Sequence, residues 1–302
     1  SSPITGAANG RRRERQPAPP PSPRHAAGGD RGRSRLSSRL RGAGSSPELL
    51  GPALLGGLFG CYLAVPFVAF VSRTGVSNVV AGLSTPEAQT AVRNSLLTAP
   101  VATVVATTLG VPLAYVLARR SFRGKRLVEL LVVLPLVVPP VVGGAMLLTA
   151  VGRFTPVGAA ATAAGIPLTD SLLGVVLAQT FVAGPFVVIT ARAGFAAVDR
   201  RFEEAARSLG YGPLATFRRV SLPLARGTII AGVVLTFARA LGEFGATLMV
   251  AYNPRTMPTQ IWVEFIGGGS DAILPLGVAL LAVAVVGLTV IQRFGQLPAL
   301  IE

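Results

Sequence analysis

Residues 204–223 read EAARSLGYGPLATFRRVSLP and lie between two long apolar runs. The run before them, 171–191, contains no Asp, Glu, Lys or Arg, and the run after them, 227–252, contains only Arg239 and Glu243. Each run reaches the roughly 20 apolar residues that a helix needs to cross a hydrocarbon core about 30 Å thick. The stretch is polar and has the pattern of a helix, which indicates a loop with a task of its own between two membrane spans.

The same apolar character recurs along the chain. Of the 302 residues 51% are hydrophobic, and they gather into blocks instead of spreading in amphipathic patterns. Four further blocks lack Asp, Glu, Lys and Arg: 49–71, 95–118, 130–151 and 273–292. Because lipid offers no water to backbone groups, blocks of this length must be helices. The sequence therefore predicts an all-α membrane protein with six transmembrane helices, kinked locally by internal prolines.

The blocks divide the chain into three parts. We expect a basic N-terminal tail at 1–48, a transmembrane domain at 49–292 with a long polar loop at 192–226, and a short C-terminal tail at 293–302. The first tail is rich in Arg, Pro, Gly and Ser and has little to bury, so it should be disordered. Three interpretations of this tail are open: a solvated extension, an over-long gene start or an organelle transit peptide. We expect no cleaved secretory leader.

Basic residues in the loops predict the orientation. The N-terminal tail, the segment between spans two and three, the loop at 192–226 and the C-terminal end together hold 23 of the 28 Lys and Arg residues, and the alternate loops hold four. Since cytoplasmic loops carry the excess of Lys and Arg, both termini and the long loop should face the cytoplasm of a multi-pass cell-membrane protein. The tail arginines have no aromatic residues among them, so we expect no nucleic-acid binding, only attraction to anionic membrane lipid.

Histidine and cysteine are nearly absent. His25 is the only histidine and lies in the tail, so we expect no histidine-based metal site and no catalytic triad in the folded part. Cys61 is the only cysteine and lies inside the first predicted span, which excludes an intramolecular disulfide.

Two short helices are predicted in the long loop. Asp199 is a suitable N-cap for the first of them, and Gly210 is a natural helix stop. Pro213 then suits the first position of a second helical piece. Two small helices at an angle form a knob, and Ala205 and Ala206 on its surface let a partner protein approach closely.

This loop resembles the cytoplasmic signature of the permease subunits of binding-protein-dependent ABC importers. That signature is Glu-Ala-Ala, three residues, Gly, nine residues, Ile, one residue and Leu-Pro, and it matches here except for Val220 at the Ile position. The resemblance covers residues 90–292 and implies a type I importer permease fold with cytoplasmic coupling helices. It also implies that the following residues couple the permease to an ATPase subunit: Glu204, Ala205, Ala206, Gly210, Leu222 and Pro223.

A narrower likeness appears in the fifth predicted span. Residues 237–254, 242–247 and 251–265 resemble the molybdate and tungstate permeases more than their sulfate relatives. The resemblance implies import of molybdate or tungstate by a homodimer, with an ABC ATPase subunit and a periplasmic or lipid-anchored oxyanion-binding protein as partners. A sulfate or thiosulfate ABC permease is the alternative.

Two charges inside the fifth span stand out. Intramembrane charges are costly, so Arg239 and Glu243 are functional candidates, and their spacing of four allows an ion pair on one helical face. A structural pair buried against a neighbouring helix or the dimer partner is the alternative. Glu243 would repel a dianion at low dielectric, whereas hydroxyl groups hold an oxyanion weakly. We therefore place Thr236, Arg239, Glu243 and Thr247 beside the translocation pathway, without contact between Glu243 and the anion.

A glycine pair in the third span has two interpretations. Gly143 and Gly144 follow Pro139 and Pro140 and could bend the helix around the pathway. Plain helix packing is the alternative.

The sequence also argues against other classes of protein. The single lysine, Lys125, does not lie in a P-loop, so ATP must be bound by a partner and we expect no cofactor on this chain. Neither HExxH nor GxSxG occurs, which argues against an intramembrane enzyme. A proton-coupled secondary transporter would need several intramembrane carboxylates, and a receptor or scaffold would leave the loop at 204–223 unexplained.

Overall fold

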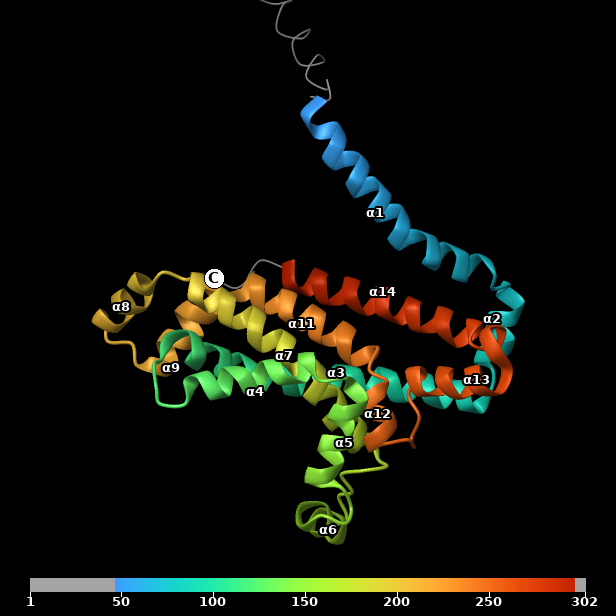
Figure 1. Ribbon diagram of the computed structural model, residues 1–302. Coiled ribbons are helices and arrows are strands. Elements are labelled where there is room, and N and C mark those ends of the chain that lie inside the picture. Colours follow the sequence, from blue (N-terminus) through green and yellow to red (C-terminus); the bar gives the residue numbers. More distant parts are fainter. Residues whose placement is uncertain (1–46, 297–302) are drawn as a thin grey trace, which may run out of the picture. The chain divides into compact units, whose positions relative to one another are not determined.

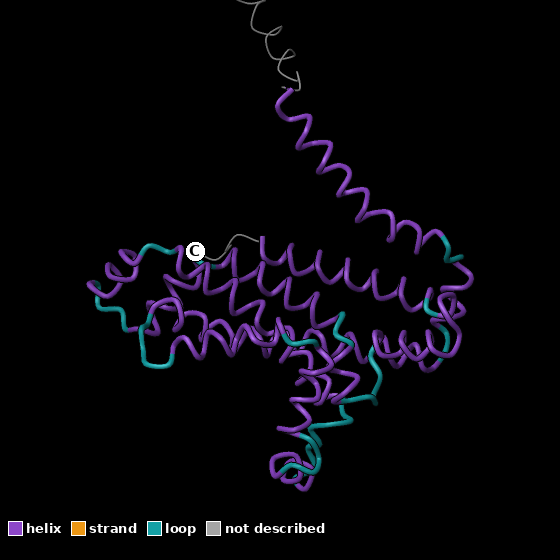
Figure 2. Tube along the Cα trace, in the orientation of Figure 1, coloured by secondary structure: helices purple, strands orange, loops and turns teal. Residues whose placement is uncertain are grey.

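The computed structural model describes residues 47–296, and this range is built from helices and loops without a strand (Figure 2). The predicted all-α class is confirmed. The predicted disordered tail, 1–48, falls outside the described residues except for its last two, and the predicted C-terminal tail falls outside them from 297 on. The helices in chain order are α1 (Pro47–Ser72), α2 (Val76–Leu83), α3 (Pro86–Arg119), α4 (Lys125–Val137), α5 (Pro140–Val151), α6 (Pro156–Ala163), α7 (Leu172–Ala197), α8 (Arg200–Ser208), α9 (Pro213–Thr216), a π-helix (Phe217–Ser221), α10 (Leu222–Leu224), α11 (Arg226–Leu241), α12 (Gly245–Val250), α13 (Met257–Ala272) and α14 (Leu274–Gln296).

The described residues divide into two units between Tyr62 and Leu63, inside α1. In the first unit the structure describes the N-terminal part of α1. The second unit contains the helices from α2 onward and the buried core, and the sites discussed below all lie in it.

Four helices in the described range are long and apolar enough to cross a membrane: α1, α3, α7 and α14. Two further pairs of helices are long and apolar enough only when each pair is taken together, and each is sharply bent at the break between its members. The bend is 68° between α5 and α6, and 76° between residues 213–224 and α11. Residues 47–296 thus contain four helices that could each cross a membrane, or up to six spans if each bent pair counts as one, and the predicted number of six stays a prediction.

Two of the predicted spans are broken. The block 130–151 is divided between α4 and α5, because Pro139 and Pro140 lack the backbone N–H groups that would continue the helix. The block 227–252 is divided between α11 and α12, and the backbone of Phe244, at φ −121° and ψ −55°, lies outside the helical region at the break. Pro100, Pro112 and Pro185, in contrast, lie inside continuous helices.

The core forms where α3, α7 and α11 pack side by side (Figure 1). Small side chains allow their backbones to approach closely, as is usual between membrane helices. Ala99 and Ala102 of α3, Ala183 of α7 and Ala240 of α11 are fully buried in one apolar cluster. At Gly232 of α11 a Cβ atom would lie 3.1 Å from the Cα of Val187, so that position admits no larger residue without a shift.

The glycine pair in α5 serves helix packing. A Cβ atom on Gly144 would lie 2.8 Å from the Cα atom of Ala246, so α5 and α12 are in close backbone contact there. Helix α5 runs unbroken through Gly143 and Gly144. The packing interpretation therefore holds, and the break in this region lies at the preceding prolines.

Candidate functional site: the α8–α9 loop and the charged break after α11

Helices α8 and α9 lie together beyond the end of α7 and before the start of α11 (Figure 1). The Asp199 side chain accepts a hydrogen bond from the backbone N–H of Arg201 at 2.9 Å and caps α8. Gly210 follows α8 with φ +86°, in the left-handed region that favours glycine, and Pro213 begins α9. The predicted cap, stop and restart are confirmed.

The surface of this loop is rich in uncovered apolar side chains. Leu209 is 79% exposed, Leu214 is 61% exposed and Phe202 is 57% exposed. Exposed apolar side chains in a polar loop can be buried by contact with a partner protein or with the membrane surface. The loop therefore presents a surface suited to a partner protein.

The predicted coupling residues do not all face outward. Glu204, Ala205 and Gly210 are exposed, and a Cβ atom on Gly210 would meet no atom within 4 Å. Pro223 is also exposed and Leu222 is half-buried, whereas Ala206 is buried. The exposed alanine is thus Ala205, and Ala206 packs inward.

The neighbouring acid, Glu203, anchors α8 to the rest of the second unit. Its Oε1 atom accepts a hydrogen bond from Nε of Arg119 at 2.8 Å and another from Oγ of Ser221 at 2.8 Å. A guanidinium nitrogen of Arg119 also donates to the carbonyl of Val198 at 2.9 Å. Glu203 and Arg119 are both buried, with side chains 5% and 7% exposed. Sequence reasoning missed this group because it assigned no partner to Glu203. The available signal was that Glu203 directly precedes the motif residue Glu204, so the two side chains point in different directions from the same helix.

A second anchor holds the segment after α9. The ring of Phe217, in the π-helix, lies 4.8 Å from that of Tyr115 and 6.0 Å from that of Phe195, measured between centroids. These three rings join α3, α7 and the π-helix, and Phe195 is fully buried. Such aromatic pairs add about 0.5–1.5 kcal/mol beyond their buried area.

The predicted ion pair in the fifth span is present. A guanidinium nitrogen of Arg239 lies 2.6 Å from Oε2 of Glu243. Oε1 of Glu243 accepts the backbone N–H of Ala246 at 2.7 Å. Glu243 is fully buried, whereas the Arg239 side chain is 28% exposed. The carboxylate thus holds the first turn of α12, and Arg239 is the member of the pair whose side chain is partly exposed.

The two predicted pathway threonines are enclosed within the fold of the single chain. Thr236 of α11 and Thr247 of α12 are fully buried, and neither hydroxyl has a hydrogen-bond partner among the described residues. They lie on either side of the break after α11. Of the four predicted pathway residues, Arg239 alone has a partly exposed side chain.

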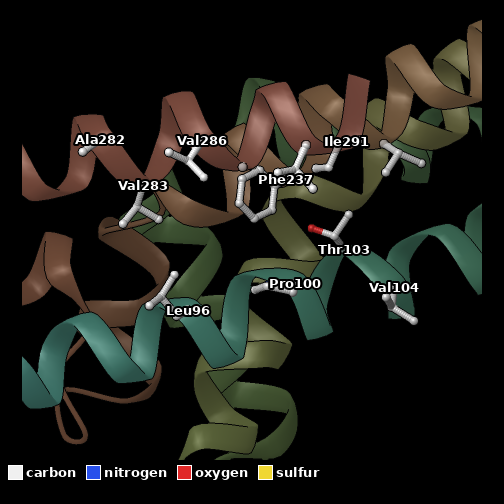
Figure 3. Close-up of a pocket in the computed structure, with 12 residues that line it drawn as sticks. Leu96, Pro100, Thr103, Val104, Phe237, Ala282, Val283, Val286 and Ile291 are labelled. Atoms are coloured by element: carbon white, nitrogen blue, oxygen red, sulfur yellow. The ribbon is translucent and has the colours of Figure 1, made fainter. Parts of the chain in front are cut away.

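A cavity of about 590 Å³ lies between α3, α11 and α14 (Figure 3). Leu96 and Pro100 of α3 face Val283 and Val286 of α14 across it, with Phe237 of α11 between them (Figure 3). Its one hydroxyl, on Thr103, is bonded to the carbonyl of Ala99. The lining offers nothing to bind an oxyanion, and it contains none of the predicted pathway residues.

Residues 110–297 match the family model described as the binding-protein-dependent transport system inner membrane component. The chain belongs to this family. The family predicted from residues 204–223 is confirmed, and with it the assignment as a transport subunit instead of an enzyme.

Several named proteins are similar in sequence to most of this chain. It is 48% identical over 245 residues, 81% of this chain and 90% of the relative, to a probable molybdenum ABC transporter permease protein of Haloferax volcanii. It is 41% identical to the molybdenum transport system permease protein of Mycobacterium tuberculosis, over 82% of this chain and 93% of the relative. It is 36% identical to the molybdate/tungstate transport system permease protein of Pyrococcus abyssi, over 80% of this chain and 93% of the relative.

Solved structures share the fold of the permease. A bacterial ABC transporter involved in the import of the acidic polysaccharide alginate matches with a TM-score of 0.65 at 17% identity, over 87% of this chain and 98% of that chain. An inward-facing form of the MetNI methionine ABC transporter matches with a TM-score of 0.53 at 16% identity, over 76% of this chain and 94% of that chain. The importer-permease fold predicted for the chain is confirmed.

Proposed function

We propose that this permease carries molybdate or tungstate into the cell, driven by a separate ATPase subunit and supplied by an extracytoplasmic oxyanion-binding protein. The observation that carries the proposal is its similarity, over about four-fifths of its length, to relatives named for molybdenum, molybdate or tungstate transport. The likeness of residues 237–265 to the same group agrees with it.

The α8–α9 loop is the proposed contact with the ATPase. Glu204, Ala205 and Gly210 lie on its surface beside the uncovered side chains of Leu209 and Leu214. A small residue and a glycine let a partner backbone come close, and the bare apolar side chains give that contact area to bury. Leu222 and Pro223 would act through the turn into α11.

The proposed pathway runs beside the break after α11. Arg239 offers an exposed positive charge whose strength is reduced by Glu243 at 2.6 Å, which suits an anion that must bind and leave again. Thr236 and Thr247 are enclosed in this protomer, so their proposed part is to contribute hydroxyl groups when α11 and α12 move.

We further propose a homodimer in the cell membrane with both termini in the cytoplasm. One protomer with one coupling loop can line only one side of a path, so two copies are needed to enclose the anion. ATP would bring the two ATPase subunits together, and the coupling loops would carry that movement into the paired permeases. No bond in the substrate is made or broken.

The test is uptake of radioactive molybdate by proteoliposomes that contain the permease, its ATPase and its binding protein. Molybdate and tungstate are tetrahedral dianions of nearly equal size, and sulfate is smaller. A binding protein that encloses the anion in a fixed shell of hydrogen-bond donors therefore distinguishes molybdate from sulfate well and from tungstate poorly. We expect ATP-dependent uptake that excess tungstate blocks and excess sulfate leaves nearly unchanged. Strong inhibition by sulfate, together with ATP-dependent sulfate uptake, would assign the permease to the sulfate branch.

A further inference from the structure

We infer that Arg119, Glu203 and Ser221 form a positioning cluster that carries movement of α8 into α3 and α11. The inference rests on the proposed function, because it concerns how the coupling loop acts once an ATPase has engaged it. The three residues come from three elements: Arg119 ends α3, Glu203 lies in α8 and Ser221 ends the π-helix.

The contacts in the cluster are short, directed and buried. Glu203 Oε1 receives both Nε of Arg119 and Oγ of Ser221 at 2.8 Å, and Arg119 also binds the carbonyl of Val198. Hydrogen bonds that involve a charged partner are about twice as strong as neutral ones. Because a buried carboxylate that loses its cation is left uncompensated, α8 cannot tilt away from Arg119 without a large penalty. The end of α3 must therefore follow α8.

Of the two elements tied to α8, helix α3 belongs to the core and the π-helix leads into it. Helix α3 packs along both α7 and α11, and the π-helix leads through α10 into α11. Helix α11 carries Arg239 close to its C-terminal end. A movement received at α8 is thus delivered to the C-terminal end of α3 and, through α10, to the start of α11, which carries it to the proposed pathway.

Neighbouring acids in α8 have separate tasks in this arrangement. Glu204 is exposed and available to a partner, whereas Glu203 is buried and bound to its own chain. Arg207, half-exposed, lies 4.0 Å from the second carboxylate oxygen of Glu203 and supplements the pair from the surface. The motif position Glu204 would receive the movement, and Glu203 would pass it on.

The experiment measures the number of molybdate ions transported per ATP hydrolysed, in proteoliposomes that contain the complete complex. The variants are Arg119→Gln, Glu203→Gln and Ser221→Ala, and the matched controls are Arg120→Gln and Ser121→Ala, which change exposed neighbours of Arg119. We expect the complex to assemble and hydrolyse ATP in each case, while the ratio falls about fivefold or more in the first two variants, the lower end of an ordinary coupling free energy. Ser221→Ala should lower the ratio less, and the controls should keep it unchanged.

A purely structural role would lower transport and ATP hydrolysis in the same proportion, and that result would overturn the inference. If Arg119→Gln and Glu203→Gln prevent assembly, Ser221→Ala decides, because it removes a single hydroxyl; an unchanged ratio there overturns the inference. Failure of the proposed function looks different, because the unaltered protein would then show no ATP-dependent molybdate uptake. If it transports sulfate instead, the same ratio measured with sulfate tests the cluster.

Discussion

Arg239 and Glu243 hold unequal positions in their ion pair. Glu243 is fully buried and binds the N–H of Ala246, whereas the Arg239 side chain keeps 28% of its surface exposed. Arg239→Gln would leave a buried carboxylate without its cation, at a cost of about 3–5 kcal/mol. Glu243→Gln would keep an oxygen that accepts the N–H of Ala246, and the unpaired Arg239 is partly exposed to polar surroundings. The substitution should therefore lower the free energy of unfolding by only about 1 kcal/mol.

Thermal unfolding of the detergent-solubilised protein measures this difference. We expect a much larger fall in Tm for Arg239→Gln than for Glu243→Gln. The double variant should recover most of the loss, because it contains no buried charge. Equal losses in the two single variants would contradict the asymmetry.

At this scale the sequence predicts pairs along one helix better than contacts between elements. The spacing of four was enough to predict the Arg239–Glu243 pair, because helical geometry brings such residues together. The tie between Arg119 and Glu203 spans 84 positions, and nothing local in the sequence relates the two residues. The burial of Ala206 beside exposed Ala205 likewise depends on how α8 turns toward the core.

Gly210 determines how α8 and α9 meet. Its φ of +86° costs about 1–2 kcal/mol for an ordinary L-residue, although the space around it is open. Gly210→Ala should therefore lower the ratio of the correctly turned loop to other loop conformations about five- to thirtyfold. We expect a loss of affinity of up to this factor when the ATPase subunit is titrated onto the detergent-solubilised permease.

Two further substitutions separate backbone strain from loss of space. Gly212 also lies in open space but has φ −67°, so Gly212→Ala is the matched control and should bind the ATPase normally. Gly210→Asn should bind better than Gly210→Ala, because Asn tolerates the left-handed conformation. Equal binding by Gly210→Ala and Gly212→Ala would contradict the role assigned to the turn.

The sequence predicts helix ends well and breaks inside apolar blocks poorly. Asp199, Gly210 and Pro213 mark their boundaries by local chemistry, and the structure agrees. Hydropathy averages over a window, so it could not separate α4 from α5 or α11 from α12. The proline pair at 139–140 was a visible signal for the first break; the second depends on Glu243, which caps α12 from a position that looks like the interior of a span.

The orientation of the whole chain is open to a direct test. In a protein with Cys61→Ala, single cysteines at Ser84 and Gly268 should react with an impermeant maleimide added outside the cell. Cysteines at Ser121 and Ser208 should react only after the membrane has been opened. All four positions are exposed, so accessibility within the fold is not limiting. The opposite labelling would reverse the proposed topology.

For the molecule as a whole, composition and one motif were sufficient for class and family. Long uncharged blocks indicate a multi-pass membrane protein because lipid permits few alternatives, and the signature at 204–223 indicates the transport family. The number of spans could not be obtained in the same way. Length alone does not tell whether a bent pair such as α5 and α6 crosses the membrane or returns to the side from which it entered.

The exposed apolar side chains of Phe202, Leu209 and Leu214 also affect how long a permease subunit survives before it has bound an ATPase. On the proposed topology they enter the cytosol uncovered until the ATPase arrives, and they form the kind of surface that chaperones and proteases bind. The subunit would then carry its own degradation signal, which assembly conceals. Its abundance in the membrane would follow the supply of its motor, so the cell would keep few idle pores.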